Sequence, residues 1–73
     1  METQEITRLQ HYLRTKFGTQ KLSLIKRKED KNSLEVTLDG EFIGTIYRDE
    51  DEGDVSYDFN MAILEMDLPP AAA

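Results

Sequence analysis

The stretch EFIGTIYRDEDEGDVSYDFNMAILEMDL, residues 41–68, decides the predicted fold of this 73-residue chain. Its first half is a β-branched and aromatic run of the kind that favours strands. In its second half, apolar and polar side chains alternate from Val55 to Ile63, which is the period of a strand with one buried face. The acidic segment 49–54 between the halves contains Gly53, which tolerates positive φ in a turn. The stretch therefore predicts a β-hairpin.

A second turn signal, Asp39-Gly40, lies directly before this stretch and after the alternating segment 34–38. This dipeptide is typical of a tight hairpin. The register stays open between two interpretations. A two-residue loop, which we favour, pairs Val36 with Ile43, whereas a three-residue loop with a glycine bulge pairs Val36 with Phe42. The two registers turn opposite faces of the third strand towards the core.

The N-terminal segment carries a helical pattern over residues 4–17. Its apolar side chains recur at spacings of three and four and form a narrow stripe that must pack on something larger, namely the sheet. The stripe consists of Ile6, Leu9, Leu13 and Phe17. Thr3 is the expected N-cap and Gly18 the expected C-terminal stop. The opposite face is polar and carries Arg8, Gln10, His11 and Arg14.

Residues 22–28 supply the first strand and end in a basic run, Lys26-Arg27-Lys28. Together these segments predict an α+β protein in which one N-terminal helix packs on a four-stranded antiparallel β-meander, in the order α-β-β-β-β. We expect a single domain over residues 1–68.

The end of the chain is less regular. Residues 60–68 also fit a short helix, although we favour a continuation of the last strand because its neighbour needs a partner of similar length. Pro69 and Pro70 end the ladder. Residues 69–73 are therefore predicted to form a disordered C-terminal tail.

Composition narrows the classes of function. The chain has no cysteine, which removes disulfides, thiolate metal sites and cysteine nucleophiles. No apolar run approaches the about 20 residues that span a bilayer, and the N-terminus does not resemble a signal peptide. We expect a cytoplasmic protein without membrane contact. A single histidine, His11, and dispersed carboxylates form no catalytic constellation, so we expect neither enzyme activity nor a cofactor.

Charge is distributed unevenly along the chain. The net charge is -6, yet residues 1–38 hold eight Lys or Arg against five Asp or Glu, and residues 39–73 hold one against ten. The opposite charges either pair within the domain or leave an acidic and a basic face that steer a partner.

The basic run Lys26, Arg27 and Lys28 is one candidate binding surface, because clustered cations contact phosphate. A sequence pI near 4.6 argues against nucleic acid, since the rest of the domain would repel it. No aromatic residue is interleaved with these cations to stack on a base. We therefore expect no nucleic-acid partner.

The acidic loop 49–54 is the second candidate, and it superficially resembles a calcium loop. The match fails in detail, because glycine is fifth rather than sixth and Asn60 stands where an EF-hand has glutamate. A solvated hairpin turn accounts better for this composition. Cation or small-ligand binding through residues 49–54 is kept as the alternative function.

The leading hypothesis is a protein-interaction module, either a homodimer or an adaptor. The third strand is expected to place Ile43 and Tyr47 on one face and Phe42 and Ile46 on the other, while one helix covers only one side of the sheet. An uncovered apolar patch favours self-association about a twofold axis. The candidate interaction surface comprises Phe42, Ile46, Lys26, Arg27, Lys28, Asp49, Glu50, Asp51 and Glu52.

Three segments resemble a small bacterial family known as domain of unknown function 3126. They are EFIGTIYRDE at 41–50, SYDFNMAILEMDL at 56–68 and TRLQHYLRTKFG at 7–18. The resemblance extends from about Thr3 to Leu68 and is most specific over 41–68. It implies a single, free-standing cytoplasmic domain and carries no catalytic or binding residues to this chain.

Overall fold

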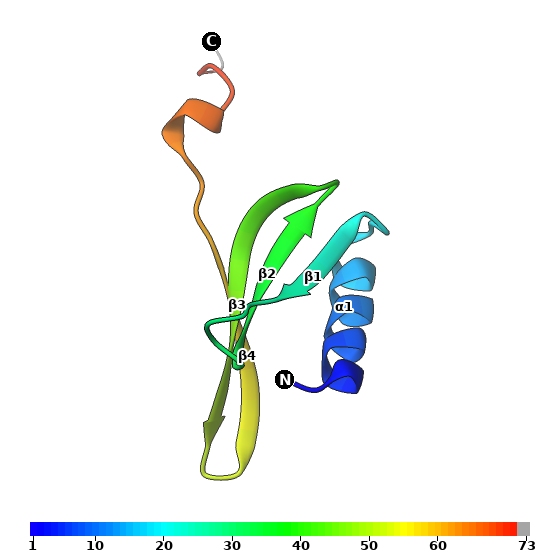
Figure 1. Cartoon of the computed structure of the whole chain (residues 1–73). Helices are drawn as coiled ribbons and strands as arrows, with labels where there is room; N and C mark the ends of the chain where they lie inside the picture. Colours follow the sequence, from blue (N-terminus) through cyan, green and yellow to red (C-terminus); the bar gives the residue numbers. More distant parts are fainter. Residues whose placement is uncertain (72–73) are drawn as a thin grey trace.

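The computed structural model describes residues 1–71 and shows one helix beside one four-stranded sheet (Figure 1). The elements are α1 (Thr3–Phe17), β1 (Leu22–Lys26), β2 (Ser33–Leu38), β3 (Glu41–Asp51), β4 (Asp54–Met61) and a single 3-10 turn, η1 (Glu65–Asp67). The strand order is β1-β2-β3-β4, and each neighbouring pair is antiparallel. The predicted α+β architecture, one N-terminal helix with an antiparallel meander, is confirmed.

Helix α1 begins and ends close to its predicted bounds. Glu2, in extended conformation and without a side-chain cap, precedes the first helical residue, Thr3, so the prediction of Thr3 as N-cap is wrong. At the other end Gly18 adopts the left-handed conformation, with φ 66°. The Thr19 N–H donates to the carbonyl of Arg14 at 3.0 Å, as in a Schellman ending.

The helix lies along β1, one of the two edge strands (Figure 1). Of the four strands, only β1 comes within 8 Å of α1, measured between Cα atoms of the described residues. Arg14 Nε donates to the carbonyl of Leu22 at 2.7 Å, and the N–H of Leu24 donates to Gln10 Oε1 at 3.1 Å. Two side chains from the polar face of the helix therefore satisfy the backbone of an edge strand.

The turn between β2 and β3 is the two-residue loop that we favoured. Asp39 and Gly40 have φ of 54° and 83°, as a type I′ turn requires, and Leu38 pairs with Glu41. Both residues of this loop need the left-handed region, which Asp tolerates and Gly adopts without strain.

Beyond the turn, the register shifts by one residue at a β-bulge. Thr37 pairs with Phe42, but Val36 pairs with Gly44, so Ile43 is the additional residue on β3. Both expected partners of Val36 are therefore wrong. The alternation of apolar and polar residues predicts continuous pairing of β2 with β3. In the structure, the bulge places two residues of β3, Ile43 and Gly44, opposite Val36 and so shifts the register.

The bulge changes which side chains of β3 face the helix. Ile43 and Ile46 are three residues apart and could not share a face of a regular strand, yet both contact the apolar core. Ile46 is only 1% exposed, whereas Tyr47 is 42% exposed on the outer face, the face away from α1. We expected Ile43 to share a face of the sheet with Tyr47, and Phe42 with Ile46. Both expectations are wrong.

The apolar core is small and lies between α1 and the first three strands. Its buried members are Leu13, Leu22, Leu34, Val36 and Ile46. Ile6 and Leu9 of the helical stripe pack against it, as predicted, but Phe17 is 56% exposed. The core therefore leaves the β4 side of the helix-facing surface incompletely covered.

Strand β4 ends at Met61, opposite Gly44, rather than continuing to residue 68 as we favoured. Residues 62–64 are extended without a sheet partner, and the helical alternative holds only for the single turn η1. We call residues 62–68 the C-terminal arm. Pro69 to Ala71 form no helix or strand, and the rest of the predicted tail, residues 72 and 73, lies outside the described residues.

The C-terminal arm projects away from the sheet, as the orange segment of Figure 1 shows. It gives the molecule extents of 49 × 24 × 23 Å and a radius of gyration of 14.2 Å. A compact domain of this length would have a radius of gyration of about 11 Å. The arm is therefore held away from the core of its own chain.

Gly44 follows the bulge and is buried in the interior of β3. A Cβ at this position would lie 2.7 Å from Cε1 of Phe59 and would meet the carbonyl oxygen of Asn60 even more closely. The missing side chain thus lets β4 and the Phe59 ring close against β3.

Replacing Gly44 by Ala should lower the free energy of unfolding by about 1–3 kcal/mol, because β4 must move to accept the methyl group. Urea denaturation measures this loss, and Thr45→Ala, on the outer face of the same strand, is the matched control. Equal stability of Gly44→Ala and Thr45→Ala would contradict this close packing.

Candidate functional site: a groove between α1 and β4

The residues predicted as an interaction surface do not form one site. Lys26 ends β1 and, with Arg27 and Lys28, borders the β1–β2 connection. Phe42 is 57% exposed at the start of β3, whereas Ile46 is buried in the core on the helix-facing side of the sheet. The bulge is the reason, because it turns Ile46 towards the helix.

The acidic residues lie at the other hairpin. Asp49, Glu50 and Asp51 end β3, and Glu52 forms the β3–β4 turn with Gly53. Within residues 1–71, no three His, Cys, Asp or Glu side chains are grouped so that they could hold a metal ion. The geometry of the described chain thus gives no support to a cation site at 49–54.

Charge pairing between the two halves of the chain is limited to Arg48. In the described part of the chain, its ion pairs with Glu5 and Glu50 are the salt bridges present. The basic run at the β1–β2 connection and the acidic β3–β4 turn therefore form no ion pair with each other.

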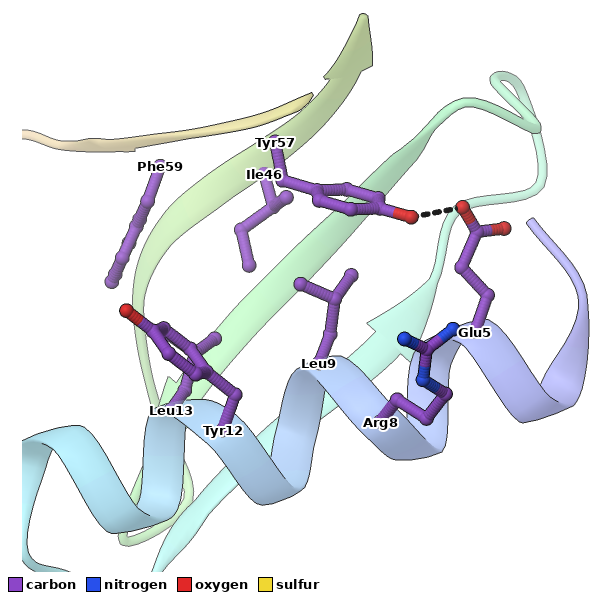
Figure 2. Close-up of a pocket in the computed structure, with 8 residues that line it drawn as sticks. All are labelled: Glu5, Arg8, Leu9, Tyr12, Leu13, Ile46, Tyr57 and Phe59. Carbon is purple, nitrogen blue, oxygen red and sulfur yellow. Dashed lines mark hydrogen bonds between the residues drawn. The ribbon is translucent and has the colours of Figure 1, made fainter. Parts of the chain in front are cut away.

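A groove between α1 and β4 is a concave, largely apolar surface on the helix-facing side of the sheet. One part of it is a cavity of about 370 Å³ between the helix and the last two strands (Figure 2). Its lining residues are Glu5, Arg8, Leu9, Tyr12, Leu13, Ile46, Tyr57 and Phe59.

A second cavity, of about 580 Å³, continues the first towards the β2–β3 turn. Its lining residues are Phe17, Thr19, Lys21, Leu22, Leu38, Asp39, Ile43, Phe59 and Met61. Phe59 lines both cavities, and we call the two together the α1–β4 groove. It exists because the helix lies along β1 and leaves the opposite half of the sheet open.

Aromatic side chains form much of the groove. Figure 2 shows Tyr12 reaching from the helix towards Phe59 on β4. Further along, the rings of Phe17 and Phe59 meet edge to face, with centroids 6.2 Å apart and planes at 89°. Lys16 Nζ lies 5.9 Å from the centroid of the Tyr12 ring, within the range of a cation–π contact. The groove thus offers apolar area with cations on its helical wall.

One end of the groove is closed by a polar network on Glu5, in the first turn of α1. The carboxylate oxygen Oε2 accepts a hydrogen bond from the Tyr57 hydroxyl (Figure 2) and another from Arg48 Nε at 2.8 Å. Arg48 Nη1 also donates to Glu50 at 3.1 Å. The network therefore joins the helix to β3 and β4.

These contacts shift the pKa of each partner. The Tyr57 hydroxyl, followed by Arg48, lowers the pKa of Glu5, although partial desolvation opposes the shift. The Glu5 carboxylate raises the pKa of Tyr57, because an ionised phenol would face a negative charge. The same carboxylate, with Glu50, raises the pKa of Arg48. These shifts favour an ionised Glu5, a protonated Tyr57 and a protonated Arg48, which are the states that bind each other. Such a network suits a structural link rather than proton transfer.

Sequence reasoning missed this groove. The alternation of Tyr57, Phe59 and Met61 correctly indicated a common face, but nothing in the sequence showed that the helix would stop short of it. Glu5 and Arg48 are 43 residues apart, and no local pattern links them. The narrowness of the helical stripe was the one available signal.

The fold and the groove define a small α+β domain with one open apolar surface between its helix and an edge strand. The chain belongs to the family described as "Protein of unknown function (DUF3126)", whose model matches residues 5–67. The resemblance noted in the sequence is thereby confirmed over nearly the whole chain. No curated protein and no solved structure matches the chain.

Within residues 1–71, no helix is long and apolar enough to cross a membrane.

Replacing Tyr57 by Phe should raise the pKa of Glu5 towards its ordinary value, because the largest cause of its lowered pKa is removed. An NMR titration of the Glu5 carboxyl carbon measures this change. Tyr12→Phe is the matched control, since Tyr12 lines the groove without a hydrogen bond to Glu5 in the described structure.

The same substitution should alter acid stability. A lowered pKa in the folded state stabilises the protein above the ordinary carboxylate pKa, and this contribution is lost as pH falls through the folded value. Tyr57→Phe should therefore lose less stability on acidification than the unsubstituted chain. Identical titrations of Glu5 in both proteins would show that the hydrogen bond does not form in solution.

Proposed function

We propose that this domain is a protein-interaction module whose binding surface is the α1–β4 groove. The observation that carries the proposal is the open apolar face between α1 and β4, bordered by Tyr12, Phe17 and Met61, which are 57, 56 and 53% exposed. Large exposed apolar patches mark interaction sites on small domains. The proposal keeps two expectations from the sequence, that the domain is not an enzyme and that it acts in the cytoplasm.

The number of exposed apolar side chains, compared with the number of buried ones, supports the proposal of a binding partner. Within residues 1–71, twelve large apolar side chains are exposed, whereas five apolar side chains are buried. Such a small core stabilises a domain of this size only marginally. A partner that covers the groove would therefore add to a limited core.

The interface proposed from the structure differs from the one expected from the sequence. The outer face of the sheet carries mainly polar pairs, such as Glu35 with Thr45 and Thr45 with Asn60. Phe42 and Tyr47 on β3 and Ile25 on β1 are exposed on this face. The binding surface proposed from the structure is instead the concave apolar surface beside the helix.

The walls of the groove indicate the chemistry of the partner. Arg8, Lys16 and Lys21 border it from the helix and the connection to β1. An open groove between two elements suits a segment of polypeptide with an apolar face, as in other helix-in-groove or extended-peptide modes. We therefore expect a partner segment that carries both large apolar and acidic side chains.

Photo-crosslinking in cells of the native host tests this proposal. A photoreactive phenylalanine analogue at position 12, in the groove, should give protein adducts of discrete mass. The same analogue at position 47 is the control, because Tyr47 is similarly exposed but lies on the outer face. Adducts of equal yield from both positions, or none from position 12, would overturn the assignment of the groove as the binding surface.

A further inference from the structure

The C-terminal arm is a second exposed apolar element, which begins directly after Met61 of the groove. A further cavity, of about 800 Å³, lies between the arm and the start of β3. The large apolar side chains of the arm are 55–84% exposed. They are Ile63, Leu64, Met66 and Leu68. The family match includes the arm as far as residue 67. Exposing four large apolar side chains on one projecting segment to water is unfavourable, and such a surface marks a site of interaction.

We infer that the C-terminal arm of one copy docks into the α1–β4 groove of a second copy, and that two copies exchange their arms about a twofold axis. The inference rests on the proposed function, because it supplies the occupant of the same groove. In a twofold exchange each chain contributes one arm and one groove, so both apolar surfaces are covered at once.

Charge complementarity favours this occupant. The charged residues of the arm are Glu65 and Asp67, both acidic. The groove is bordered by Arg8, which forms no ion pair within residues 1–71, and by Lys21. Its acidic lining residues are Glu5, which is bound to Arg48 and Tyr57, and Asp39 in the β2–β3 turn. The carboxylates of the arm would therefore pair with Arg8 and Lys21 while its apolar side chains enter the groove.

The path of the chain directs the arm towards another molecule. Met61 already lines the groove, so entry into the groove of the same chain would require a reversal immediately after it. The sequence Met61-Ala62-Ile63-Leu64 contains no Gly, Pro, Asn or Asp, the residues that tight turns use. Leu64 is instead extended, with φ -85° and ψ 140°. The arm thus continues away from its own groove.

The exposed area is sufficient for a dimer. The chain exposes 6085 Å², whereas a compact monomer of 8.4 kDa exposes about 4,600 Å². The excess, about 1,500 Å² per chain, exceeds the about 800 Å² that each partner buries in an interface of standard size. Arm exchange would bring the exposed area of each chain close to that of an ordinary globular subunit.

Disulfide trapping tests the inference directly, because the chain has no cysteine of its own. Full-length Met66→Cys is mixed with Tyr12→Cys, one of them carrying a mass tag, and the mixture is oxidised mildly. Met66 and Tyr12 are 84% and 57% exposed, so neither change disturbs the core. The mixed dimer should form at least tenfold faster than in the control mixture of Met66→Cys with Tyr47→Cys.

Several outcomes would overturn arm exchange. They are equal rates for Tyr12→Cys and Tyr47→Cys, a dominant disulfide between two Met66→Cys chains, or closure of a doubly substituted chain on itself without dimers. Light scattering that gives 8.4 kDa at every concentration up to hundreds of micromolar would also overturn it. In that case the proposed function survives if position 12 still crosslinks to a different protein in cells, and fails if it does not.

Discussion

The β-bulge at Ile43 is the constraint on which the rest of this structure depends. One extra residue on β3 lets Ile43 and Ile46 face the same core, although their spacing is odd. Without the bulge, Ile43 and Ile46 would lie on opposite faces of the sheet, with Ile46 on the outer face. The bulge thus converts an ambiguous strand into one with a defined inner face.

The same feature sets the limits of the sheet. Bulges bend a strand and increase its local twist. β3 curves beyond Gly44, and its pairing with β4 stops there, opposite Met61 (Figure 1). The chain that follows has no strand to pair with and becomes the C-terminal arm. The inserted residue therefore sets which side chains of β3 enter the core, and the arm begins where the β3–β4 pairing ends, at Gly44 and Met61.

The position of the helix accounts for the groove. Gln10 and Arg14 bind the backbone of β1, which holds α1 at one edge of the sheet. At its N-terminal end, Glu5 joins the helix to β3 and β4 by binding Arg48 and Tyr57. At its C-terminal end, the Phe17 ring meets Phe59 of β4, and the α1–β4 groove is open along this side of the helix. The edge of β1 is thus protected while a face of the sheet is left for a partner.

Much of the fold could be predicted from local sequence. The helical stripe, the Gly18 stop and the Asp39-Gly40 turn depend on neighbours in the chain, and all three are present. The bulge could not be predicted, because it is decided by which apolar residues of β3 the core can accommodate. The alternation up to Ile63 was misleading, because β4 has no pairing partner after Met61.

The groove depends on contacts between distant segments. Glu5 meets Arg48 and Tyr57 only after the strand register is fixed, and Gln10 and Arg14 look like ordinary solvent-facing residues in a helical pattern. Charge asymmetry suggested that the two halves of the chain would attract each other, yet only Arg48 forms ion pairs in the described structure. Local composition does not contain the information about which charges meet.

An NMR NOESY spectrum with assigned methyl and ring protons tests the bulge most directly. The structure predicts NOEs from the Ile46 methyl groups to Leu34 and Leu13, and none from the Tyr47 ring to either leucine. Continuous pairing without the bulge would put Thr45 opposite Leu34, turn Ile46 to the outer face and bring Tyr47 to the face of the helix. NOEs from the Tyr47 ring to Leu34 and Leu13, with Ile46 lacking contacts to both, would contradict the account.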